Sequence, residues 1–288
     1  MLQSGLDWLE ERTGKPVLGV VPYLDNFYLD AEDAINTQQL KDDAGSLLKV
    51  VVPVLPRISN HTDFDALRLH PQVNLQYVSV QQTCPDADLI ILPGSKNVRA
   101  DLAQLKQHGW AEQLQRHLRY GGKLLGICGG YQMLGRVIND PMGVEDVAGS
   151  AAGFSFFDME TTLEASKQLR NVSGVFIHRD FIDVAFDGYE IHCGQTIFTG
   201  AAKPDGLLQF PDGRIDGVYS HDNQIFGTYI HGLFDRSEVS SAVLRWAGLR
   251  EHSEYEVDIS MLREKQLDRL ADTLQENLQP EFLKMLAG

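Results

Sequence analysis

The sequence has few cysteines and no long apolar run, and each shortage excludes a class of protein. Its 288 residues include only three cysteines, Cys84, Cys128 and Cys193. Because this number is odd and the spacing is wide, the cysteines form neither a disulfide framework nor a zinc ribbon. The longest apolar runs, such as residues 50–52, end within a few residues, whereas a membrane span needs about 20. We therefore expect no bound metal and no membrane partner.

Positive charge is also scarce. Lys and Arg number 25 against 40 Asp and Glu, which gives a formal net charge of −15. A field of this sign repels phosphate backbones, so nucleic acid is not an expected partner. The first residues lack the basic start and apolar stretch of a secretory signal peptide, which predicts a cytoplasmic protein.

The composition that remains is that of a globular α/β protein, with 43% apolar and 23% charged residues. From about residue 47, short apolar runs suited to buried strands alternate with helical stretches, which predicts a mostly parallel sheet flanked by helices. In the second half, turn pairs such as Asp187-Gly188 and Asp212-Gly213 separate the strand candidates, which predicts antiparallel strands. The strand candidates of the first half are 49–54, 73–80, 88–92 and 123–127, and the helices are 98–107 and 110–120.

Cys128 has the setting of a catalytic nucleophile. A buried strand runs directly into it within residues 126–130, Gly-Ile-Cys-Gly-Gly, and a helix is expected to start at once. Such a sharp turn projects the side chain from the carboxyl end of the strand, and the glycines leave room for it. The N–H groups that begin the helix favour thiolate over thiol. Most free cysteines are small buried apolar residues. We therefore expect Cys193, in its strand, to pack in the core or at an edge, and Cys84, in a loop, to have no role.

An acyl-transfer site also needs donors for the oxyanion that develops on the substrate. The N–H of Gly129, next to the nucleophile, is placed to be one of them. The neighbouring strand ends in Leu-Pro-Gly-Ser, so Gly94, together with Ser95, is the candidate for the second donor.

A thiol nucleophile needs a base within hydrogen-bond distance. Among nine histidines, His231 ends an alternating strand and is followed by a glycine, and strand ends are where α/β sites assemble. His192 is a second candidate, because alternation puts it on the same strand face as Glu190. A solvated or structural role is favoured for the histidines without such a setting, namely His61, His70, His108, His117 and His252.

These motifs resemble the class I, triad-type glutamine amidotransferases. The resemblance rests on Cys128 with Gln132 four residues later, on the turn at Gly94 and on the strand that ends in His231. It implies a flavodoxin-like fold, attack of the cysteine on the carboxamide of L-glutamine, a γ-glutamyl thioester and released ammonia. It also implies that Gln132 holds the substrate, with Tyr131 beside it, and that Gly94 and Gly129 are the oxyanion donors.

Four further motifs together resemble the cobyric acid synthase family. They are residues 57–65, 92–96, 188–192 and 227–235. The resemblance implies that the ammonia is used for ATP-dependent amidation of a corrinoid, adenosyl-cobyrinic acid a,c-diamide, in cobalamin biosynthesis.

The sequence departs from most triad enzymes at the position two residues after the histidine. A glutamate usually stands there and orients the imidazole, but this chain has Leu233. Cobyric and cobyrinic acid synthases also lack this acid, so the resemblance implies a Cys–His dyad. Asp235 and Glu190 remain open as accessory residues that orient the ring. Without a carboxylate the imidazolium is less stabilised, so we expect slow glutamine hydrolysis unless the acceptor is bound.

The second departure concerns the ATPase half of the family, a dethiobiotin synthetase-like domain that uses ATP and Mg to activate the carboxylate. The chain contains no Gly-x-x-x-x-Gly-Lys-Ser/Thr motif, so we expect it to bind no cofactor itself. Residues 1–45 resemble only the end of that domain plus a linker. We predict a glutamine amidotransferase domain at 46–240 and a C-terminal helical extension at 241–288, in a truncated protein or fragment whose partner is the missing ATPase domain.

Two alternatives remain open. The first is a glutaminase for another acceptor, as in cobyrinic acid a,c-diamide synthase or the partner of a cell-wall ligase. Residues 59–65 favour cobyric acid synthase over these. The second is a truncated binding module without catalysis, which a glutamine-mimicking electrophile would distinguish by failing to label Cys128.

Overall fold

The computed structural model describes residues 2–24, 27, 47–181, 183–200, 204–250 and 259–287. The chain divides into two compact units, one formed by Met1–Asp30 with Ile259–Gly288 and the other by Ala31–Asp258. Within the described ranges no helix is both long and apolar enough to cross a membrane.

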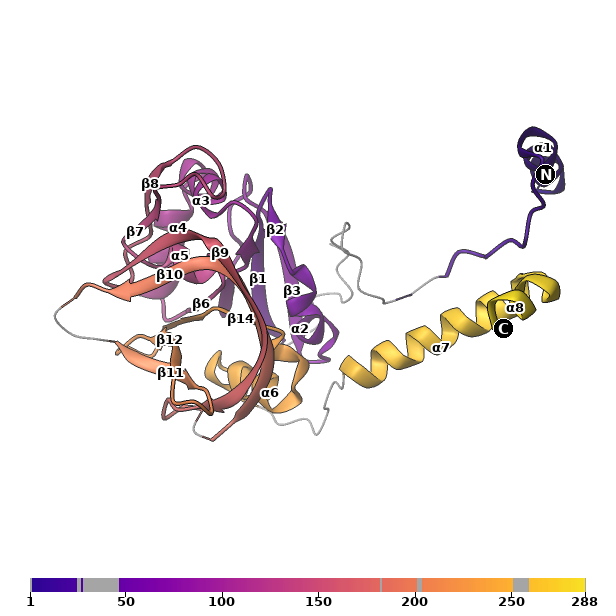
Figure 1. Ribbon diagram of the computed structural model, residues 1–288. Helices are drawn as coiled ribbons and strands as arrows, with labels where there is room; N and C mark the ends of the chain where they lie inside the picture. Colours follow the sequence, from indigo (N-terminus) through magenta and orange to yellow (C-terminus); the bar gives the residue numbers. More distant parts are fainter. Residues whose placement is uncertain are drawn as a thin grey trace. The chain divides into compact units, whose positions relative to one another are not determined.

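Five parallel strands form one end of the main sheet in the larger unit, and β1, β3 and β6 among them are labelled in Figure 1. Their order across the sheet is β3, β1, β4, β6 and β13, and each neighbouring pair is parallel. All four residues of β4 and most of β1 are buried. Their continuous apolar runs predicted this burial, because such runs are typical of strands covered on both faces. The strand bounds are β1 (Leu48–Val54), β3 (Val73–Ser79), β4 (Leu89–Leu92), β6 (Lys123–Ile127) and β13 (Ile225–Thr228).

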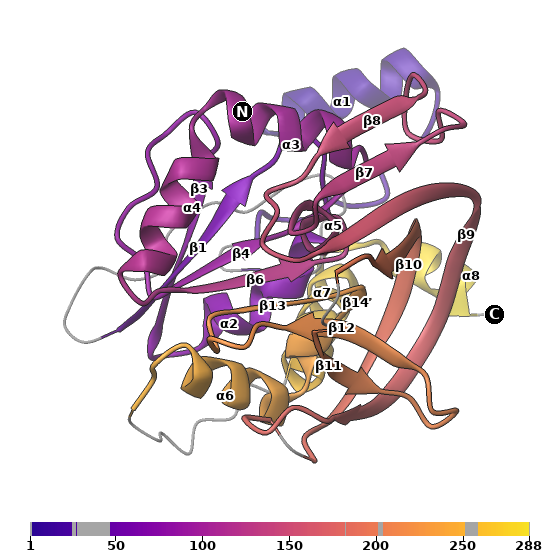
Figure 2. The ribbon, with the colours of Figure 1, turned by 90° about the vertical axis from the view of Figure 1, so that its left-hand side faces the viewer.

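Helices flank these strands, so the predicted α/β architecture is confirmed. Figure 2 shows α3 (Val98–Gln107) and α4 (Trp110–Arg119) above the parallel strands and α6 (Ser237–Trp246) below them. Trp110 anchors α4, because its ring is fully buried and its indole N–H donates to the Val80 carbonyl at 2.8 Å. The shorter helices are η1 (His61–Phe64), α2 (Asp65–Leu69), α5 (Gly129–Met133) and η2 (Leu233–Asp235).

The second half of the larger unit is mostly antiparallel, as predicted, although β7 (Val137–Asp140) pairs with β9 (Met159–Phe176) in parallel. A long curved pair, β9 and β10 (Ala185–Phe198), dominates it in Figure 1, and its register shifts between His192 and Gly194. The remaining strands of this sheet are β8 (Gly149–Ala152), β11 (Asp205–Gln209), β12 (Ile215–Tyr219) and β14 (Ile230–His231). A separate two-stranded ladder joins β2 (Ile58–Ser59) to β5 (Gly94–Ser95).

The smaller unit is helical, with α1 (Leu2–Thr13), α7 (Ile259–Asn277) and α8 (Pro280–Ala287). Gly19 forms an antiparallel bridge with Leu278, and the Gln279 side chain donates to the Val17 carbonyl at 2.9 Å. Within the predicted ATPase remnant, residues 25, 26 and 28–45 lie outside the described residues. The predicted boundaries after residues 45 and 240 stay predictions.

The contact between α5 and β4 generates a stability prediction. A Cβ at Gly130 would lie 2.0 Å from the Leu92 carbonyl oxygen, a backbone atom that cannot move without displacing the strand. We expect Gly130→Ala to lower the free energy of unfolding by about 3 kcal/mol in urea denaturation. Gly149→Ala is the matched control, because its Cβ would meet only the end of the Arg99 side chain. Equal stabilities of the two variants would contradict this prediction.

Candidate active site

Cys128 stands at the junction of β6 and α5 in a strained backbone conformation. Its φ of 49° and ψ of −105° lie where side chains are rarely tolerated. Its backbone N–H donates to the Thr228 carbonyl at 2.8 Å, which ties the turn to β13. The sharp turn predicted after the strand is therefore present, and it puts the thiol at the carboxyl edge of the parallel strands.

The glycines around Cys128 bring neighbouring backbones close to it. A Cβ at Gly129 would lie 2.9 Å from the Ser95 backbone nitrogen, and one at Gly94 would lie 3.1 Å from Cε1 of His231. The structure therefore gathers the predicted oxyanion donors and the predicted base at one place. The Ser95 hydroxyl is used elsewhere, since it donates to Asp101 at 2.6 Å. Only the backbone of Ser95 is left for a substrate.

His231 lies on β14 with its imidazole held by Asp63. Nδ1 is 2.6 Å from Oδ2 of Asp63, and the other carboxylate oxygen accepts the Gly232 N–H at 2.9 Å. Both side chains are buried, at 1% and 4% exposed. Because an ionised carboxylate can only accept, Nδ1 carries the proton and Nε2 is the nitrogen left for Cys128.

The electrostatic surroundings strengthen His231 as a base. Burial alone lowers its pKa, but the charge and hydrogen bond of Asp63, with those of Cys128, outweigh burial and raise the pKa to about 10. At neutral pH a histidine with this pKa is an imidazolium, so Nε2 already holds a proton beside the sulfur of Cys128.

The carboxylate that orients His231 is thus Asp63, and neither Asp235 nor Glu190, the two residues left open by the sequence, contacts Nδ1. Glu190 is buried and forms an ion pair with Arg170. Asp235 ends η2. Residues 63 and 231 are separated by 168 positions, so local sequence carries no sign of their pairing. The one available signal is that Asp63 belongs to the 57–65 motif.

A second residue that sequence reasoning missed is Tyr189. Its ring stacks on His231 with centroids 5.3 Å apart and an interplanar angle of 19°. Its hydroxyl accepts a hydrogen bond from the side chain of Asn60 at 3.0 Å. Asn60 has a left-handed φ of 52° and lies three residues before Asp63, so one short segment fixes both neighbours of the imidazole.

Gln132 and Tyr131 are both buried on α5 but face different surroundings. The Gln132 amide donates to the Tyr229 hydroxyl at 3.4 Å. Tyr131 packs edge-to-face on Tyr229 with centroids 5.1 Å apart. Tyr131 therefore occupies a packing position, and its predicted contact with substrate stays a prediction.

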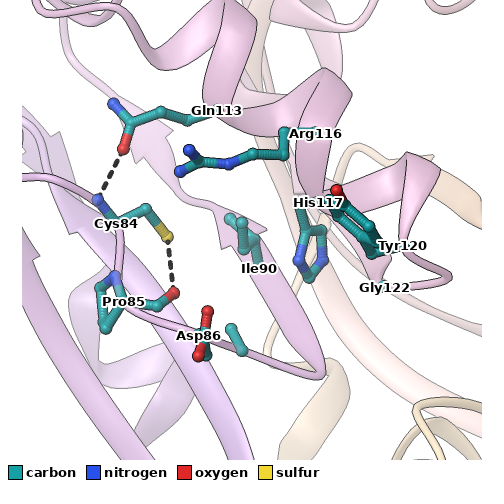
Figure 3. Close-up of a pocket in the computed structure, with 10 residues that line it drawn as sticks. Cys84, Pro85, Asp86, Ile90, Gln113, Arg116, His117, Tyr120 and Gly122 are labelled. Carbon is teal, nitrogen blue, oxygen red and sulfur yellow. Dashed lines mark hydrogen bonds between the residues drawn. The ribbon is translucent and has the colours of Figure 1, made fainter.

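The other conspicuous thiol lies at the opposite edge of the parallel strands. Cys84 precedes β4 and lines a cavity of about 270 Å³ with Gln113, Arg116 and His117 (Figure 3). The thiol donates to the Pro85 carbonyl at 3.4 Å, and burial raises its pKa to about 11. Such a thiol is a poor nucleophile.

Over the described part of the chain, no group of three or more His, Cys, Asp or Glu side chains is arranged to hold a metal ion.

Comparison with known proteins identifies this architecture. The family model for the CobB/CobQ-like glutamine amidotransferase domain matches residues 49–239. The fold is similar to that of PurLQS from Thermotoga maritima, with 18% identity and a TM-score of 0.52 over 69% of this chain and 99% of that chain. It is also similar to a putative GMP synthase component from Thermoplasma acidophilum, with 15% identity and a TM-score of 0.51 over 77% and 99%. At these identities the two structures show the fold alone.

The raised pKa of His231 predicts how Asp63 affects stability. A histidine whose folded pKa of about 10 exceeds its unfolded value contributes stability that is complete below about pH 6.5 and is lost as the pH rises through 10. We expect Asp63→Asn to lower the free energy of unfolding by about 3 kcal/mol near pH 6. The difference in this free energy between the variant and the wild type should become smaller towards pH 10. Urea denaturation at several pH values measures this. Asp187→Asn, at an exposed position, is the control and should lower the free energy of unfolding only slightly, without this dependence on pH. A loss of stability in Asp63→Asn that grows with pH would contradict the pairing of Asp63 with His231.

Proposed function

The chain belongs to the CobB/CobQ-like glutamine amidotransferase domain family, and from that premise we propose that it hydrolyses L-glutamine through Cys128, His231 and Asp63. The observation that carries the proposal is the strained turn at Cys128 beside an imidazole that is hydrogen-bonded to a buried carboxylate. A strained turn costs about 1–3 kcal/mol. A binding module without catalysis would gain nothing from it.

In the proposed reaction, Nε2 of His231 holds the proton of the Cys128 thiol, and the thiolate attacks the carboxamide carbon. The imidazolium is stabilised by Asp63, and the oxyanion accepts hydrogen bonds from the Gly129 N–H and the Gly94–Ser95 backbone. When the intermediate collapses, the C–N bond breaks and His231 gives its proton to the departing ammonia. A water molecule, deprotonated by His231, then hydrolyses the γ-glutamyl thioester to glutamate and restores the thiol.

Asp63 changes the expected rate. A Cys–His dyad without a carboxylate leaves the imidazolium weakly stabilised, which led to the expectation of slow hydrolysis. With Asp63 at 2.6 Å from Nδ1, the imidazolium is stabilised and the correct tautomer is fixed before substrate binds. The site therefore needs no acceptor to supply the orienting charge.

The acceptor we propose is a corrinoid carboxylate. The support is the 57–65 motif, whose likeness to cobyric acid synthases gains weight because it supplies Asn60 and Asp63 to the site. In this proposal the ammonia serves ATP-dependent amidation of adenosyl-cobyrinic acid a,c-diamide. The ATP and Mg that activate the carboxylate are bound by a separate ATPase domain.

The hydrolytic step is tested by ammonia release and by labelling with acivicin, an electrophile that mimics glutamine. We expect Cys128→Ala to lower kcat at least about 1,000-fold and to abolish the acivicin adduct, because it removes the nucleophile. Cys84→Ser is the matched control and should keep both within twofold. Turnover that survives Cys128→Ala, or an adduct located on another residue, would refute the assignment.

The acceptor is tested by reconstitution with the corrinoid, ATP and Mg. Alone, the chain should convert glutamine to glutamate without amidating the corrinoid. Addition of the ATPase domain of a cobyric acid synthase should produce glutamine-dependent amidation, and ammonium salts should replace glutamine when Cys128→Ala is used. Amidation by the chain alone contradicts the division of labour. If the mixture of the wild-type chain and the ATPase domain amidates the corrinoid with ammonium salts but not with glutamine, the proposed partnership between the two is contradicted.

A further inference from the structure

Asp101, in the first turn of α3, is a fully buried carboxylate that the proposed chemistry does not yet use. It forms an ion pair with Arg57, whose Nη1 lies 3.4 Å from Oδ1 of Asp101. This pair is a loose one, because the Arg57 side chain is 48% exposed whereas that of Asp101 is 0% exposed. A buried charge is costly unless its partners compensate it, so the position of this carboxylate requires an explanation.

The charge of Asp101 does not itself stabilise the fold. Burial raises the pKa of Asp101, and the hydrogen bonds from Ser95 and Arg57, with the charge of Arg57, lower it by less. A raised pKa means that the ionised carboxylate is less favourable in the folded protein than in water. Carboxylates kept in such surroundings are typical of functional sites.

One oxygen of Asp101 holds both strands of the short β2–β5 ladder. Oδ2 accepts the hydroxyl of Ser95, on β5, at 2.6 Å and the backbone N–H of Arg57, the residue before β2, at 3.2 Å. The Ser95 oxygen accepts the Asn97 N–H at 3.0 Å. Asn97 also caps α3, because its side chain accepts the Ala100 N–H. The ladder is therefore tied to the first turn of this helix.

The bond to the Arg57 N–H takes the place of a bond within the ladder. The Lys96 N–H donates to the Arg57 carbonyl at 2.8 Å. In a regular antiparallel ladder the Arg57 N–H would donate back to the Lys96 carbonyl. It donates to Asp101 instead, so the end of the ladder is held by α3.

The same pattern sets the direction of the Ser95 N–H. Ile58 and Ser95 are the next facing pair of the ladder. Because the flanking residues carry the hydrogen bond, this is a non-hydrogen-bonded pair, and its N–H groups point away from the opposite strand. The Ser95 N–H is therefore not used by the ladder.

This N–H lies beside the nucleophile, in a short segment that needs support. A Cβ at Gly129, next to Cys128, would be 2.9 Å from the Ser95 nitrogen. β5 has only two residues, and Gly94, the first, has no side chain to restrain its peptide. A small rotation of that peptide would turn the Ser95 N–H away from a substrate at Cys128. The Ser95 hydroxyl is the side-chain attachment that opposes this rotation.

We propose that Asp101 is a positioning residue for the reaction: through the Ser95 hydroxyl and the Arg57 N–H, it holds the Gly94–Ser95 peptide so that the Ser95 N–H donates to the oxyanion. This inference rests on the proposed glutaminase function and adds to it a residue that does not touch the substrate. Its effect belongs to the step in which negative charge develops on the carboxamide oxygen. Asp101 therefore supports turnover more than the binding of glutamine.

The direct test measures kcat and KM for glutamine in Asp101→Leu and Asp101→Asn. Leucine is close to aspartate in shape but accepts no hydrogen bond. Asp101→Leu should therefore lower kcat about 100-fold, the effect of losing one oxyanion donor, and leave KM within about threefold. Asparagine can keep an oxygen in the place of Oδ2, with its amide nitrogen towards the exposed Arg57 side chain.

Asp101→Asn should consequently rescue the reaction and keep kcat within about fivefold of the wild type. Equal losses of kcat in the two variants would overturn the role of Asp101 as an acceptor. A kcat for Asp101→Leu within twofold of the wild type would overturn the proposal as a whole.

Alkylation of Cys128 separates the oxyanion from the nucleophile. Iodoacetamide reacts with a thiolate by direct displacement of iodide, a step in which no oxyanion forms. Asp101→Leu should therefore be alkylated at Cys128 within about twofold of the wild-type rate, with the modified residue located by mass. A fall in this rate that matches the fall in kcat would indicate a displaced thiol or imidazole and would overturn the positioning role.

Ser95→Ala tests the connection between Asp101 and the peptide, and it decides the matter if Asp101→Leu does not fold. It removes the hydroxyl and keeps the backbone, so it should lower kcat about tenfold. In the Asp101→Leu background it should lower kcat no further, because the two side chains act through one hydrogen bond. An unchanged kcat in Ser95→Ala, or losses that add in the double variant, would contradict this connection.

The matched control is Asp140→Leu. Asp140 is also fully buried, lies 3.4 Å from an arginine, Arg99, and accepts two backbone N–H groups, but these belong to Val144 and Glu145. This variant should keep kcat within about threefold, and it separates the loss of the tether from the general cost of replacing a buried carboxylate. A loss of kcat as large as that of Asp101→Leu would overturn the assignment.

The outcomes distinguish the two proposals. A wild-type protein that releases no ammonia from glutamine fails as a glutaminase, and the role of Asp101 fails with it. A wild-type protein that is active, with variants of Asp101 and Ser95 that are equally active, overturns the role of Asp101 alone.

Discussion

The hydrogen bond between Asp63 and His231 is the interaction on which the site depends. It joins η1 to β14 across 168 residues and lies almost wholly out of water. A buried charge pair contributes little net stability, because removing both groups from water offsets their attraction. Its value is geometric: the carboxylate holds the ring by Nδ1, so that Nε2 is available to the thiol. The account of the chemistry follows from this one contact.

The segment from Ile58 to Phe64 links the pieces of the site. Its first two residues pair with Gly94 and Ser95, the backbone proposed for the oxyanion. Asn60 turns the chain through a left-handed conformation and supports Tyr189, and Asp63 follows. A displacement of this segment would therefore disturb the oxyanion backbone, the stacked tyrosine and the base together. On the other side of the site, the strained turn at Cys128 holds the nucleophile in place.

Much of the fold could be predicted because its signals are local. The run 49–54 predicted a buried strand that the structure places at Leu48–Val54, and the helix at 98–107 has the predicted bounds. The turn at Cys128 was predictable for the same reason, since its glycines are adjacent in sequence. The partner of His231 was not. Glu190 and Asp235 were considered because they are near candidate histidines along the chain, whereas Asp63 meets His231 only when β14 and η1 come together. Tyr189 was missed because stacking depends on the register of β10 with β14, in which Tyr189 lies opposite His231. The assignment of residues 1–45 to an ATPase remnant stays a prediction.

A crystal structure of the Cys128→Ala variant with L-glutamine is the most direct test of the central claim. The account predicts the carboxamide carbon beside residue 128, its oxygen towards the N–H groups of Gly129 and the Gly94–Ser95 backbone, and His231 still bonded through Nδ1 to Asp63. A glutamine bound away from residue 128, or an imidazole turned from Asp63 with its Nε2 directed away from the substrate, would contradict it.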